Sequence, residues 1–319
     1  MPRVFLLVLV AALIGGFAAS TLFGREDPSP QQTALSGGGD IRDVAIILPT
    51  PTAVTPCPAC GQDEAAWRAQ TAVPPPVLLG KSAALIEASC GRQVFGQQSH
   101  ERRAPASLTK IATALVVADQ NRMQEQVDIQ LNGWDLSAED DSSIMGLEAG
   151  MRMPVSELVW GLLLRSGNDA AVELARIFGG QARFVDLMNA KVKSLGLKDT
   201  QFKNPHGLDA DGLYSTTFDM AVLGKTLLAH PTLAEMVRTK DHPTTWSSEA
   251  MPNGNWLLYV YPDSIGIKTG YTENAGATIV SAATRDGRTL VASVFDSADV
   301  FWDSMRLFDW AFANTRSSC

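Results

Sequence analysis

The segment 264–295, SIGIKTGYTENAGATIVSAATRDGRTLVASVF, decides the fold. It contains three strand-like runs, at 264–272, 277–284 and 289–295, and the sequence RDGR at 285–288 separates the last two. An Asp-Gly pair between two such runs is typical of a tight β-hairpin turn. We therefore expect an antiparallel meander of three strands in this part of the chain.

Helical patterns precede this meander, and one more follows it. In 154–165, for example, apolar residues recur at helical spacing behind a proline suited to the first turn. The predicted helices are 107–119, 154–165, 169–178, 181–195, 216–229 and 299–313, and a further hairpin is predicted at 82–89 and 93–98. A hairpin, a block of helices, a meander and a final helix predict an α+β fold with helices packed on an antiparallel β-sheet.

Composition excludes several classes of protein. The 319 residues are 45% hydrophobic and 19% charged, which excludes a wholly disordered chain, and neither a collagen period nor coiled-coil heptads are present. The net charge of −8 argues against a dedicated nucleic-acid binder, which usually presents a basic face. Four cysteines are too few for a disulfide scaffold.

The first 23 residues predict the compartment. Arg3 precedes an uncharged, mostly apolar run over 4–23, which contains the small residues AAS at 18–20. This pattern is typical of an export signal, and the run is also long enough to span a bilayer. Two alternatives stay open, a cleaved signal peptide or an uncleaved membrane anchor. Both place the rest of the chain outside the cytoplasm, in the cell envelope.

Residues 24–76 have the composition of a linker, and 77–319 remain as the globular domain. The linker holds nine of the 17 prolines and the sequence SGGG at 36–39. Such a segment buries too little apolar surface to offset the entropy lost on ordering.

Two of the four cysteines, Cys57 and Cys60, lie inside this linker. No second pair and no nearby histidine supports a zinc site, and no βαβ context supports a thioredoxin-like redox site. We expect a structural disulfide, either between these two cysteines or from one of them to Cys90. Cys319 has no predicted partner.

The first of three short motifs is Ser-x-x-Lys, which occurs once, from Ser107 to Lys110. Residues i and i+3 share one face of a helix, so the hydroxyl and the amine can meet. A serine needs an adjacent base to act as a nucleophile, and Lys110 can be that base if burial and a second cation lower its pKa. The alternative is a helix-capping serine with a solvated lysine.

The second motif is Ser166-Gly167-Asn168, which lies between two predicted helices. Its chemical interpretation is a polar turn that places a second hydroxyl and an amide in a cleft. The alternative is an ordinary turn in which Asn168 caps the following helix.

The third motif is Lys268-Thr269-Gly270, which lies on a predicted strand and is followed by Tyr271. Gly270 lacks a side chain, so the backbone of a substrate can run along this strand. Lys268 offers a cation for a carboxylate and a field that lowers the pKa of Lys110. The alternative is a solvated strand lysine beside a turn glycine.

Together the three motifs carry a resemblance. Their order is that of penicillin-binding proteins and class A β-lactamases, with gaps of 59 residues (107 to 166) and 102 residues (166 to 268). Five stretches match closely: APASLTK at 104–110, SGNDA at 166–170, FVDLMN at 184–189, NPHGLD at 204–209 and GIKTGYT at 266–272. Residues 80–313 therefore resemble the D-alanyl-D-alanine carboxypeptidase family, the low-molecular-mass, serine-type penicillin-binding proteins.

This resemblance implies a fold and an activity. The fold is penicillin-binding-protein/β-lactamase-like, an antiparallel sheet with packed helices plus a helical subdomain. The activity is removal of the terminal D-alanine from peptidoglycan stem peptides that end in D-Ala-D-Ala, through an acyl-serine intermediate. β-Lactam antibiotics such as penicillin would acylate the same serine. The resemblance implies no metal and no organic cofactor.

The resemblance also implies roles for the residues of the first two motifs. Ser107 attacks the carbonyl between the two D-alanines, and Lys110 takes the serine proton. Ser166 relays a proton toward the leaving D-alanine. Asn168 holds both the substrate and Lys110.

On the third motif, the resemblance implies that Lys268 and Thr269 bind the terminal carboxylate. The backbone N–H groups of Ser107 and Tyr271 form the oxyanion hole. Gly270 leaves room for the substrate.

Two features depart from the family pattern. Relatives often carry an arginine just before the final helix, whereas this chain has FWD at 301–303, and the nearest arginine is Arg306. We therefore expect carboxylate binding to rest more on Lys268 and Thr269. The chain also ends soon after the predicted catalytic domain, which favours 4–23 as a membrane anchor.

Other functions stay as alternatives. A DD-endopeptidase or a transpeptidase shares the acyl-enzyme. A class A β-lactamase needs a glutamate base after the second motif, and Glu173, Glu235 and Glu249 all lack the Glu-x-x-Leu-Asn form. An inactive wall-binding scaffold would be favoured by the loss of a motif residue, and none is lost. Metal hydrolysis is disfavoured because no pair of histidines has ligand spacing among His100, His206, His230 and His242, which fit surface or core positions.

Overall fold

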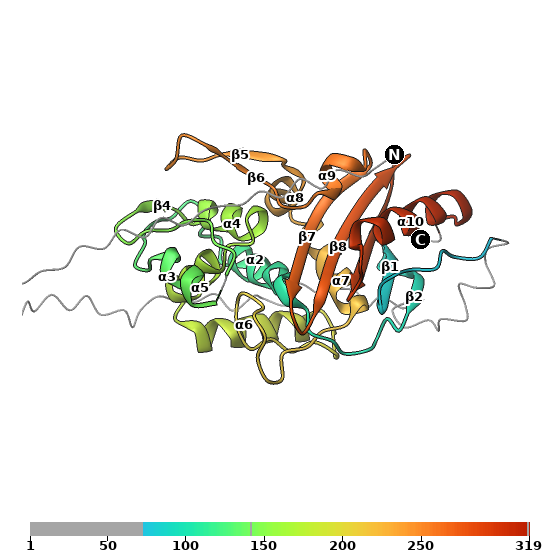
Figure 1. Ribbon diagram of the computed structural model, residues 1–319, viewed down its shortest axis with the longest axis horizontal. Helices are drawn as coiled ribbons and strands as arrows, with labels where there is room; N and C mark the ends of the chain where they lie inside the picture. Colours follow the sequence, from blue (N-terminus) through green and yellow to red (C-terminus); the bar gives the residue numbers. More distant parts are fainter. Residues whose placement is uncertain (1–72, 141, 318) are drawn as a thin grey trace, which may run out of the picture. The chain divides into compact units, whose positions relative to one another are not determined.

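The computed structural model of the chain describes residues 73–140, 142–317 and 319 (Figure 1). Its central element is a five-stranded sheet in the order β2-β1-β9-β8-β7. All neighbouring strands in this sheet are antiparallel. The strands are β1 (Ser82–Glu87), β2 (Gln93–Gln97), β7 (Ser264–Thr272), β8 (Gly276–Arg285) and β9 (Arg288–Phe295). The predicted meander is β7-β8-β9, and β7 forms one edge of the sheet.

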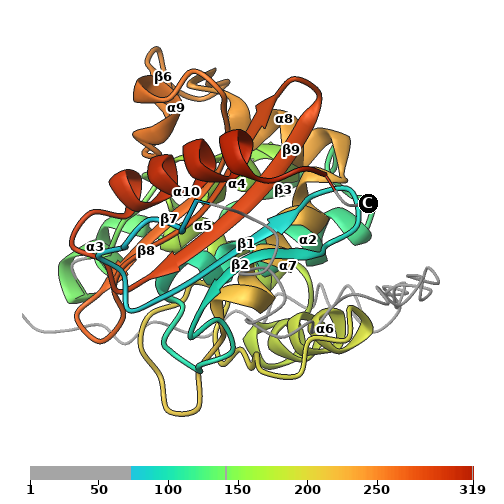
Figure 2. The ribbon, with the colours of Figure 1, turned by 90° about the vertical axis from the view of Figure 1, so that its right-hand side faces the viewer.

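Helices cover both faces of the sheet (Figure 2). The C-terminal helix α10 (Val300–Asn314) packs on β8 and β9 from one side, and α7 (Thr217–Leu228) packs on β1 and β9 from the other. Alternate residues of a strand face opposite sides. On β9, Leu290 accordingly packs in the cluster under α10, and Val291 packs in the larger cluster with α7.

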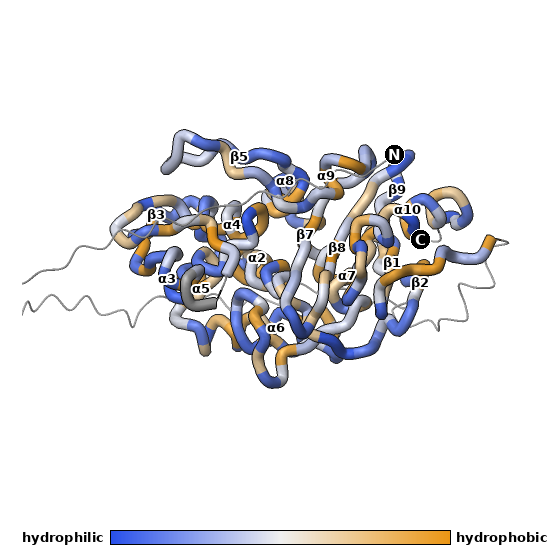
Figure 3. The backbone as a smooth tube through the Cα atoms, in the orientation of Figure 1, coloured by the Kyte–Doolittle hydropathy of each residue, from blue (hydrophilic) through white to orange (hydrophobic). Residues whose placement is uncertain are grey.

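A helical region lies beside the β7 edge (Figure 1). It contains the short 3-10 helix η2 (Ala106–Leu108) and the helices α2 (Thr109–Asp119), α3 (Gly133–Asp140), α4 (Val155–Leu164), α5 (Asn168–Ile177) and α6 (Gln181–Ser194). Helix α8 (Pro231–Arg238) packs on β7. Hydrophilic residues lie mainly in loops and on outer helix faces (Figure 3).

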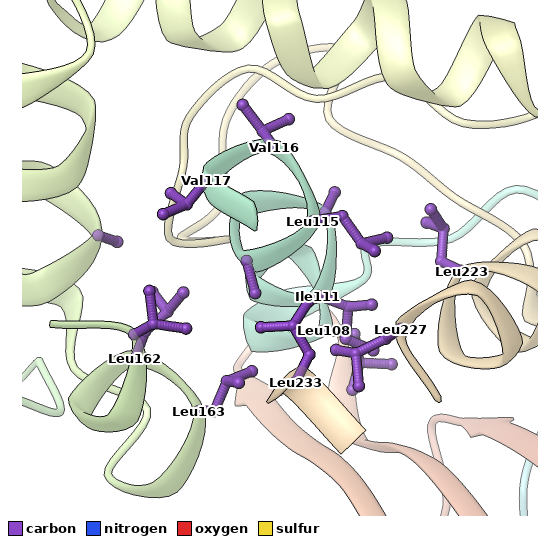
Figure 4. Close-up of a cluster of buried hydrophobic side chains, with 14 of the residues drawn as sticks. Leu108, Ile111, Leu115, Val116, Val117, Leu162, Leu163, Leu223, Leu227 and Leu233 are labelled. Atoms are coloured by element: carbon purple, nitrogen blue, oxygen red, sulfur yellow. The ribbon is translucent and has the colours of Figure 1, made fainter. Parts of the chain in front are cut away.

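Helix α2 is the centre of the larger hydrophobic cluster. All its residues except the last are buried, and neighbouring helices supply contacts on several sides (Figure 4). Leu162 of α4, Leu223 of α7 and Leu233 of α8 lie around it. A helix that is apolar on every side needs such complete burial. The packing fixes the position of α2, and therefore of the motif at its start.

The predicted α+β class is confirmed, and the differences lie in short elements. The sequence patterns did not predict two small two-stranded sheets, nor the helices α3, α8 and α9 (Leu257–Val260). These sheets are β3 (Gln126–Asp128) with β4 (Arg152–Pro154), and β5 (Asp241–Pro243) with β6 (Ala250–Pro252). Strands of three residues are too short to show an alternating pattern.

The predicted partner of Cys90 is wrong. Cys90 lies in the turn between β1 and β2 and forms a disulfide with Cys319, with a Cα–Cα distance of 6.0 Å. The chain returns to this turn after α10, and Arg288 binds this returning segment through the carbonyl and hydroxyl oxygens of Thr315. The alternative pairing of Cys57 with Cys60 lies outside the described residues.

The N-terminal predictions also fall mostly outside the described residues. Segment 1–23 and most of the predicted linker are not among them, so the signal peptide or anchor stays a prediction. In the described part of the chain, no helix has the length and apolar character needed to cross a membrane. From Val73 onward the chain is held against α10, where the indole N–H of Trp310 donates to the carbonyl of Val73 at 3.1 Å.

Asp303 of α10 anchors this N-terminal segment. Its buried carboxylate accepts the backbone N–H groups of Leu79 and Gly80 at 2.9 and 2.8 Å and the hydroxyl of Ser297 at 2.7 Å. We expect Asp303→Ala to lower the free energy of unfolding by about 3 kcal/mol, because it leaves buried donors without acceptors. Thermal and urea unfolding measure this loss.

Asp309→Ala on the same helix is the matched control. The side chain of Asp309 is 60% exposed and its ion pair with Arg285 lies at the surface, so the loss is expected to be about 1 kcal/mol or less. Equal losses in the two variants would contradict the anchoring role of Asp303.

Candidate active site

Ser107 lies in the 3-10 turn η2, directly before the buried helix α2. The preceding residue, Ala106, has a positive φ of 50°, which is strained for a residue other than glycine. The loop at 204–208 crosses this turn closely, because a Cβ on Gly207 would lie 1.9 Å from the carbonyl oxygen of Ala106. Glycine is therefore required at 207, and the close approach holds the backbone ahead of Ser107 in its strained conformation.

Lys110 is buried and lies one helical turn after Ser107. Its Nζ is 3.0 Å from Ser107 Oγ, 2.7 Å from Asn168 Oδ1 and 2.7 Å from the carbonyl oxygen of His206. The relative exposure of Lys110 is 0%. The alternative of a capping serine with a solvated lysine therefore does not describe this pair.

The surroundings lower the pKa of Lys110 well below its ordinary value. Loss of hydration is the main cause, because burial penalises the charged amine, and the nearby positive charge of Lys268 adds to the effect. The carboxylate of Asp169 acts in the opposite direction, but it is the smallest of the three effects. The lowered pKa favours the neutral amine of Lys110, the form that can accept a proton from Ser107.

Asn168 connects the second motif to this amine. It begins α5, and its side chain accepts a hydrogen bond from Lys110 and donates one to the hydroxyl of Ser142 at 3.0 Å. The side chain is engaged in the site and does not cap the helix. The neighbouring Asp169 fixes the start of α5, since its carboxylate accepts the backbone N–H groups of 145–147 at 2.9 to 3.0 Å.

Ser166 lies in the short turn between α4 and α5, two residues before Asn168. It is half-buried and has a φ of 60°, so this turn too is strained at a residue other than glycine. The turn is held by hydrogen bonds from the N–H of Gly167 to Gly161 and from the N–H of Asn168 to Ser143. These bonds therefore fix Ser166 relative to Asn168, the residue that binds Lys110.

The third motif lies on the edge strand β7, beside Ser107. A Cβ on Gly270 would lie 2.9 Å from the backbone N of Ser107 and 2.7 Å from Thr278 Oγ1. The absence of a side chain at 270 thus allows β7 to approach the nucleophile closely. Thr269 beside it is half-buried, and Tyr271 is 67% exposed. Among the described strands β7 pairs only with β8, so an extended peptide can add to its other edge.

Lys268 is 2% exposed, so it is not the solvated strand lysine of the alternative interpretation. Its amine donates to the carbonyl of Thr269 at 2.8 Å. Burial lowers the pKa of Lys268 to about 7. The amine of Lys268 therefore changes between its charged and neutral forms near neutral pH. When it is charged, it lowers the pKa of the nearby Lys110.

Sequence patterns missed the contribution of His206. Its backbone carbonyl accepts a hydrogen bond from Lys110, and burial together with Lys110 lowers the pKa of its imidazole to about 4. The loop that carries it is tied to α2, because Thr113 Oγ1 donates to the carbonyl of Pro205 at 2.6 Å. The only signal was the stretch NPHGLD at 204–209, which resembled the family but suggested no chemical role.

The departure at 301–303 has a structural explanation. Asp303 anchors the residues before β1, as described above, and Arg306 donates to the carbonyl of Val77 at 2.9 Å and lies over the ring of Trp302. Arg306 is thus engaged at the outer side of α10. Among the described residues, no cluster of three or more His, Cys, Asp or Glu side chains is arranged to hold a metal ion.

The sequence is similar to those of bacterial D-alanyl-D-alanine carboxypeptidases. The chain is 36% identical over 226 residues to D-alanyl-D-alanine carboxypeptidase DacF of Bacillus subtilis, which covers 68% of this chain and 57% of that protein. It is 36% identical over 252 residues to D-alanyl-D-alanine carboxypeptidase DacA of Escherichia coli K12, with 74% and 62% covered. The chain thus spans about three fifths of the length of these two relatives.

Solved structures agree with the sequence relatives. The D-alanyl-D-alanine carboxypeptidase of Mycobacterium tuberculosis H37Rv superimposes with a TM-score of 0.72 at 32% identity, over 78% of this chain and 99% of that one. The DD-transpeptidase of Streptomyces K15 superimposes with a TM-score of 0.71 at 30% identity, over 76% and 100%. The sequence model of D-alanyl-D-alanine carboxypeptidases matches residues 69–299, well over half of the chain. These matches confirm the resemblance seen in the motifs, and the chain belongs to the D-alanyl-D-alanine carboxypeptidase family.

Proposed function

We propose that this protein is an exported, penicillin-sensitive serine carboxypeptidase that removes the terminal D-alanine from peptidoglycan stem peptides. One observation carries the proposal. The buried amine of Lys110 lies 3.0 Å from the hydroxyl of Ser107 and 2.7 Å from the amide oxygen of Asn168. A dehydrated amine in this position is a base for a serine nucleophile.

Acylation begins with transfer of the Ser107 proton to the neutral amine of Lys110. The Ser107 oxygen then bonds to the carbonyl carbon between the two D-alanines, and the bond from that carbon to the nitrogen of the last D-alanine breaks. Ser166 passes the proton from Lys110 to the leaving nitrogen. The products are free D-alanine and an ester between Ser107 and the shortened peptide.

The β7 edge binds the substrate during this step. Lys268 and Thr269 hold the terminal carboxylate, and the strand runs beside the peptide where Gly270 leaves room. The backbone N–H groups of Ser107 and Tyr271 stabilise the negative oxygen of the tetrahedral intermediate, an arrangement typically worth about 10²–10³ in rate per donor. The closeness of Gly270 to the backbone N of Ser107 supports this pairing of donors.

Hydrolysis of the ester completes the cycle. Water attacks the ester carbonyl, releases the shortened peptide as a carboxylic acid and restores the hydroxyl of Ser107. A β-lactam presents a strained amide to the same serine and forms the corresponding ester.

Export is supported by the cysteine chemistry. The disulfide between Cys90 and Cys319 is typical of proteins in oxidising compartments. Together with the apolar run at 4–23 it favours a location in the cell envelope. Attachment to the membrane through that run is part of this proposal.

A transpeptidase is the second candidate, because the fold also superimposes on the DD-transpeptidase of Streptomyces K15. It would transfer the same acyl group to an amine instead of water, and an endopeptidase would differ only in the leaving group. For a β-lactamase, Glu173 is a poor base, since its buried carboxylate is paired with Arg176 at 2.6 Å. The complete set of contacts around Lys110 disfavours an inactive scaffold.

The central prediction concerns the nucleophile and its base. Wild-type protein is expected to bind labelled penicillin covalently and to release D-alanine from a peptide ending in D-Ala-D-Ala. Ser107→Ala is expected to lose both reactions, and Lys110→Met, which keeps the volume of the side chain, is expected to fold but acylate at least about 10³-fold more slowly. Mass spectrometry of the protein and the peptide measures both, and labelling of Ser107→Ala would place the nucleophile elsewhere.

The charge of Lys268 predicts a pH dependence. The amine is protonated below its pKa of about 7 and neutral above it, so the free enzyme binds a carboxylate best at the acidic side of this value. We expect kcat/KM for peptides with a free carboxylate to fall as the pH rises through about 7. Lys268→Arg keeps its charge and is expected to move this fall to higher pH. If kcat/KM of Lys268→Arg falls at the same pH as that of the wild type, another group causes the fall.

The close approach of β7 predicts a steric effect. In Gly270→Ala the new Cβ meets the backbone N of Ser107, and we expect acylation by penicillin to slow about 100-fold or more, because small displacements of reacting groups are costly. Gly254→Ala is the control, since its Cβ lies in ordinary contact, 3.4 Å from the carbonyl of Leu164. Stopped-flow labelling with a check of Tm tests this, and equal rates in the two variants would contradict it.

A further inference from the structure

An open cavity of about 300 Å³ lies beside the second motif and has no part in the mechanism above. The residues that line it come from the start of α3, the segment before β4 and the end of α4. They are Trp134, Ser143, Ile144, Met145, Gly146 and Arg165.

The cavity adjoins the catalytic residues on two of its walls. Ser143 follows Ser142, whose hydroxyl accepts a hydrogen bond from Asn168, and Arg165 directly precedes Ser166. Neighbouring Cα atoms are about 3.8 Å apart, so the cavity begins one residue away from the site. An extended peptide advances about 3.3–3.6 Å per residue. Contacts of 3.0 Å from Ser107 to Lys110, 2.7 Å from Lys110 to Asn168 and 3.0 Å from Asn168 to Ser142 connect the nucleophile to this wall. A peptide bound at Ser107 therefore needs only a few residues to span this separation.

The wall of the cavity is rigid. The carboxylate of Asp169 holds the backbone N–H groups of Met145, Gly146 and Leu147, and Met145 is buried against the core. The N–H of Gly133, at the start of α3, donates to the carbonyl of Leu147 at 2.8 Å, which fixes the base of Trp134 to the same wall. A site held in this way loses little entropy when it binds a ligand.

The chemistry of the cavity favours an anion on a short apolar stem. Arg165 carries the one charge among the lining residues, its side chain is exposed, and its guanidinium has no hydrogen-bond or ion-pair partner among the described residues. A guanidinium binds a carboxylate through two parallel hydrogen bonds. The ring of Trp134 is 58% exposed and offers an apolar surface beside that cation.

We propose that the Trp134–Arg165 cavity is a subsite for a carboxylate on the part of the peptide that stays attached to Ser107. The inference rests on the proposed function, because it concerns the acyl group of that reaction. Arg165 and Trp134 are specificity-determining residues here and take no part in bond breaking. The carboxylate has two possible sources, the side chain of the residue next to D-Ala-D-Ala or a group on the residue before that.

The test compares synthetic peptides ending in D-Ala-D-Ala. One pair carries a carboxylate or the matching carboxamide on the residue next to D-Ala-D-Ala, and a second pair carries the same change one residue earlier. With Arg165→Gln we expect kcat/KM to fall about tenfold for the carboxylate peptide of one pair, mainly through KM, and to stay within about twofold for its carboxamide. The pair that shows the loss identifies the source of the carboxylate.

Further variants separate the charge from the shape of the cavity. Arg165→Lys keeps the positive charge but loses the two parallel N–H donors of the guanidinium. Compared with Arg165→Gln, it is therefore expected to restore part of the preference for the carboxylate peptide over its carboxamide. Trp134→Ala is expected to weaken the binding of both members of the affected pair. Arg152→Gln is the control, because it removes an arginine whose side chain is 65% exposed at the surface. In neither pair is it expected to change the ratio of kcat/KM for the carboxylate peptide to kcat/KM for its carboxamide.

Two results overturn the proposal, and they are distinguishable. If wild-type protein releases D-alanine but Arg165→Gln alters each carboxylate peptide and its carboxamide equally, or alters neither, then the subsite is wrong and the proposed function stands. If wild-type protein releases no D-alanine from any of the four peptides, the proposed function fails, and the subsite that rests on it fails as well.

Discussion

The dehydrated amine of Lys110 is the constraint on which the rest of the structure depends. Its three hydrogen-bond partners come from separate parts of the chain: the hydroxyl of Ser107 at 3.0 Å, the side chain of Asn168 at 2.7 Å and the carbonyl of His206 at 2.7 Å. A buried polar group is costly unless it is hydrogen-bonded, so all three segments have to meet around it. The same burial lowers the pKa of Lys110 and makes it a base.

Close packing of the backbone fixes the positions of the three segments that meet around Lys110. Helix α2 is buried on every side and cannot rotate without disturbing its neighbours. Gly207 lets the 204–208 loop touch Ala106, and Gly270 lets β7 touch the backbone of Ser107. The strained conformations of Ala106 and Ser166 are held by the contact of Gly207 with Ala106 and by the hydrogen bonds of the turn that contains Ser166.

Much of the fold was predictable because its long elements carry periodic patterns. The first strand of the meander was predicted over 264–272, and β7 occupies those residues. The three-residue strands β3 to β6 were missed, because a pattern cannot repeat within them. The partner of Cys90 was predicted wrongly, since the choice among the cysteines depends on where the segment after α10 runs. His206 was missed because it contributes its backbone carbonyl, which every residue type possesses.

The amino-acid sequence by itself determined which reactive groups exist and how the nearest ones pair. The spacing from Ser107 to Lys110 places them on one helix face, and glycines stand where the backbone has to pass closely. Only the tertiary structure decided that Lys110 and Lys268 are dehydrated, and that Asn168 and the 204–208 loop meet the first amine. The physical reason is that a pKa depends on burial and on charges that lie far away along the chain, and neither exists before the chain folds.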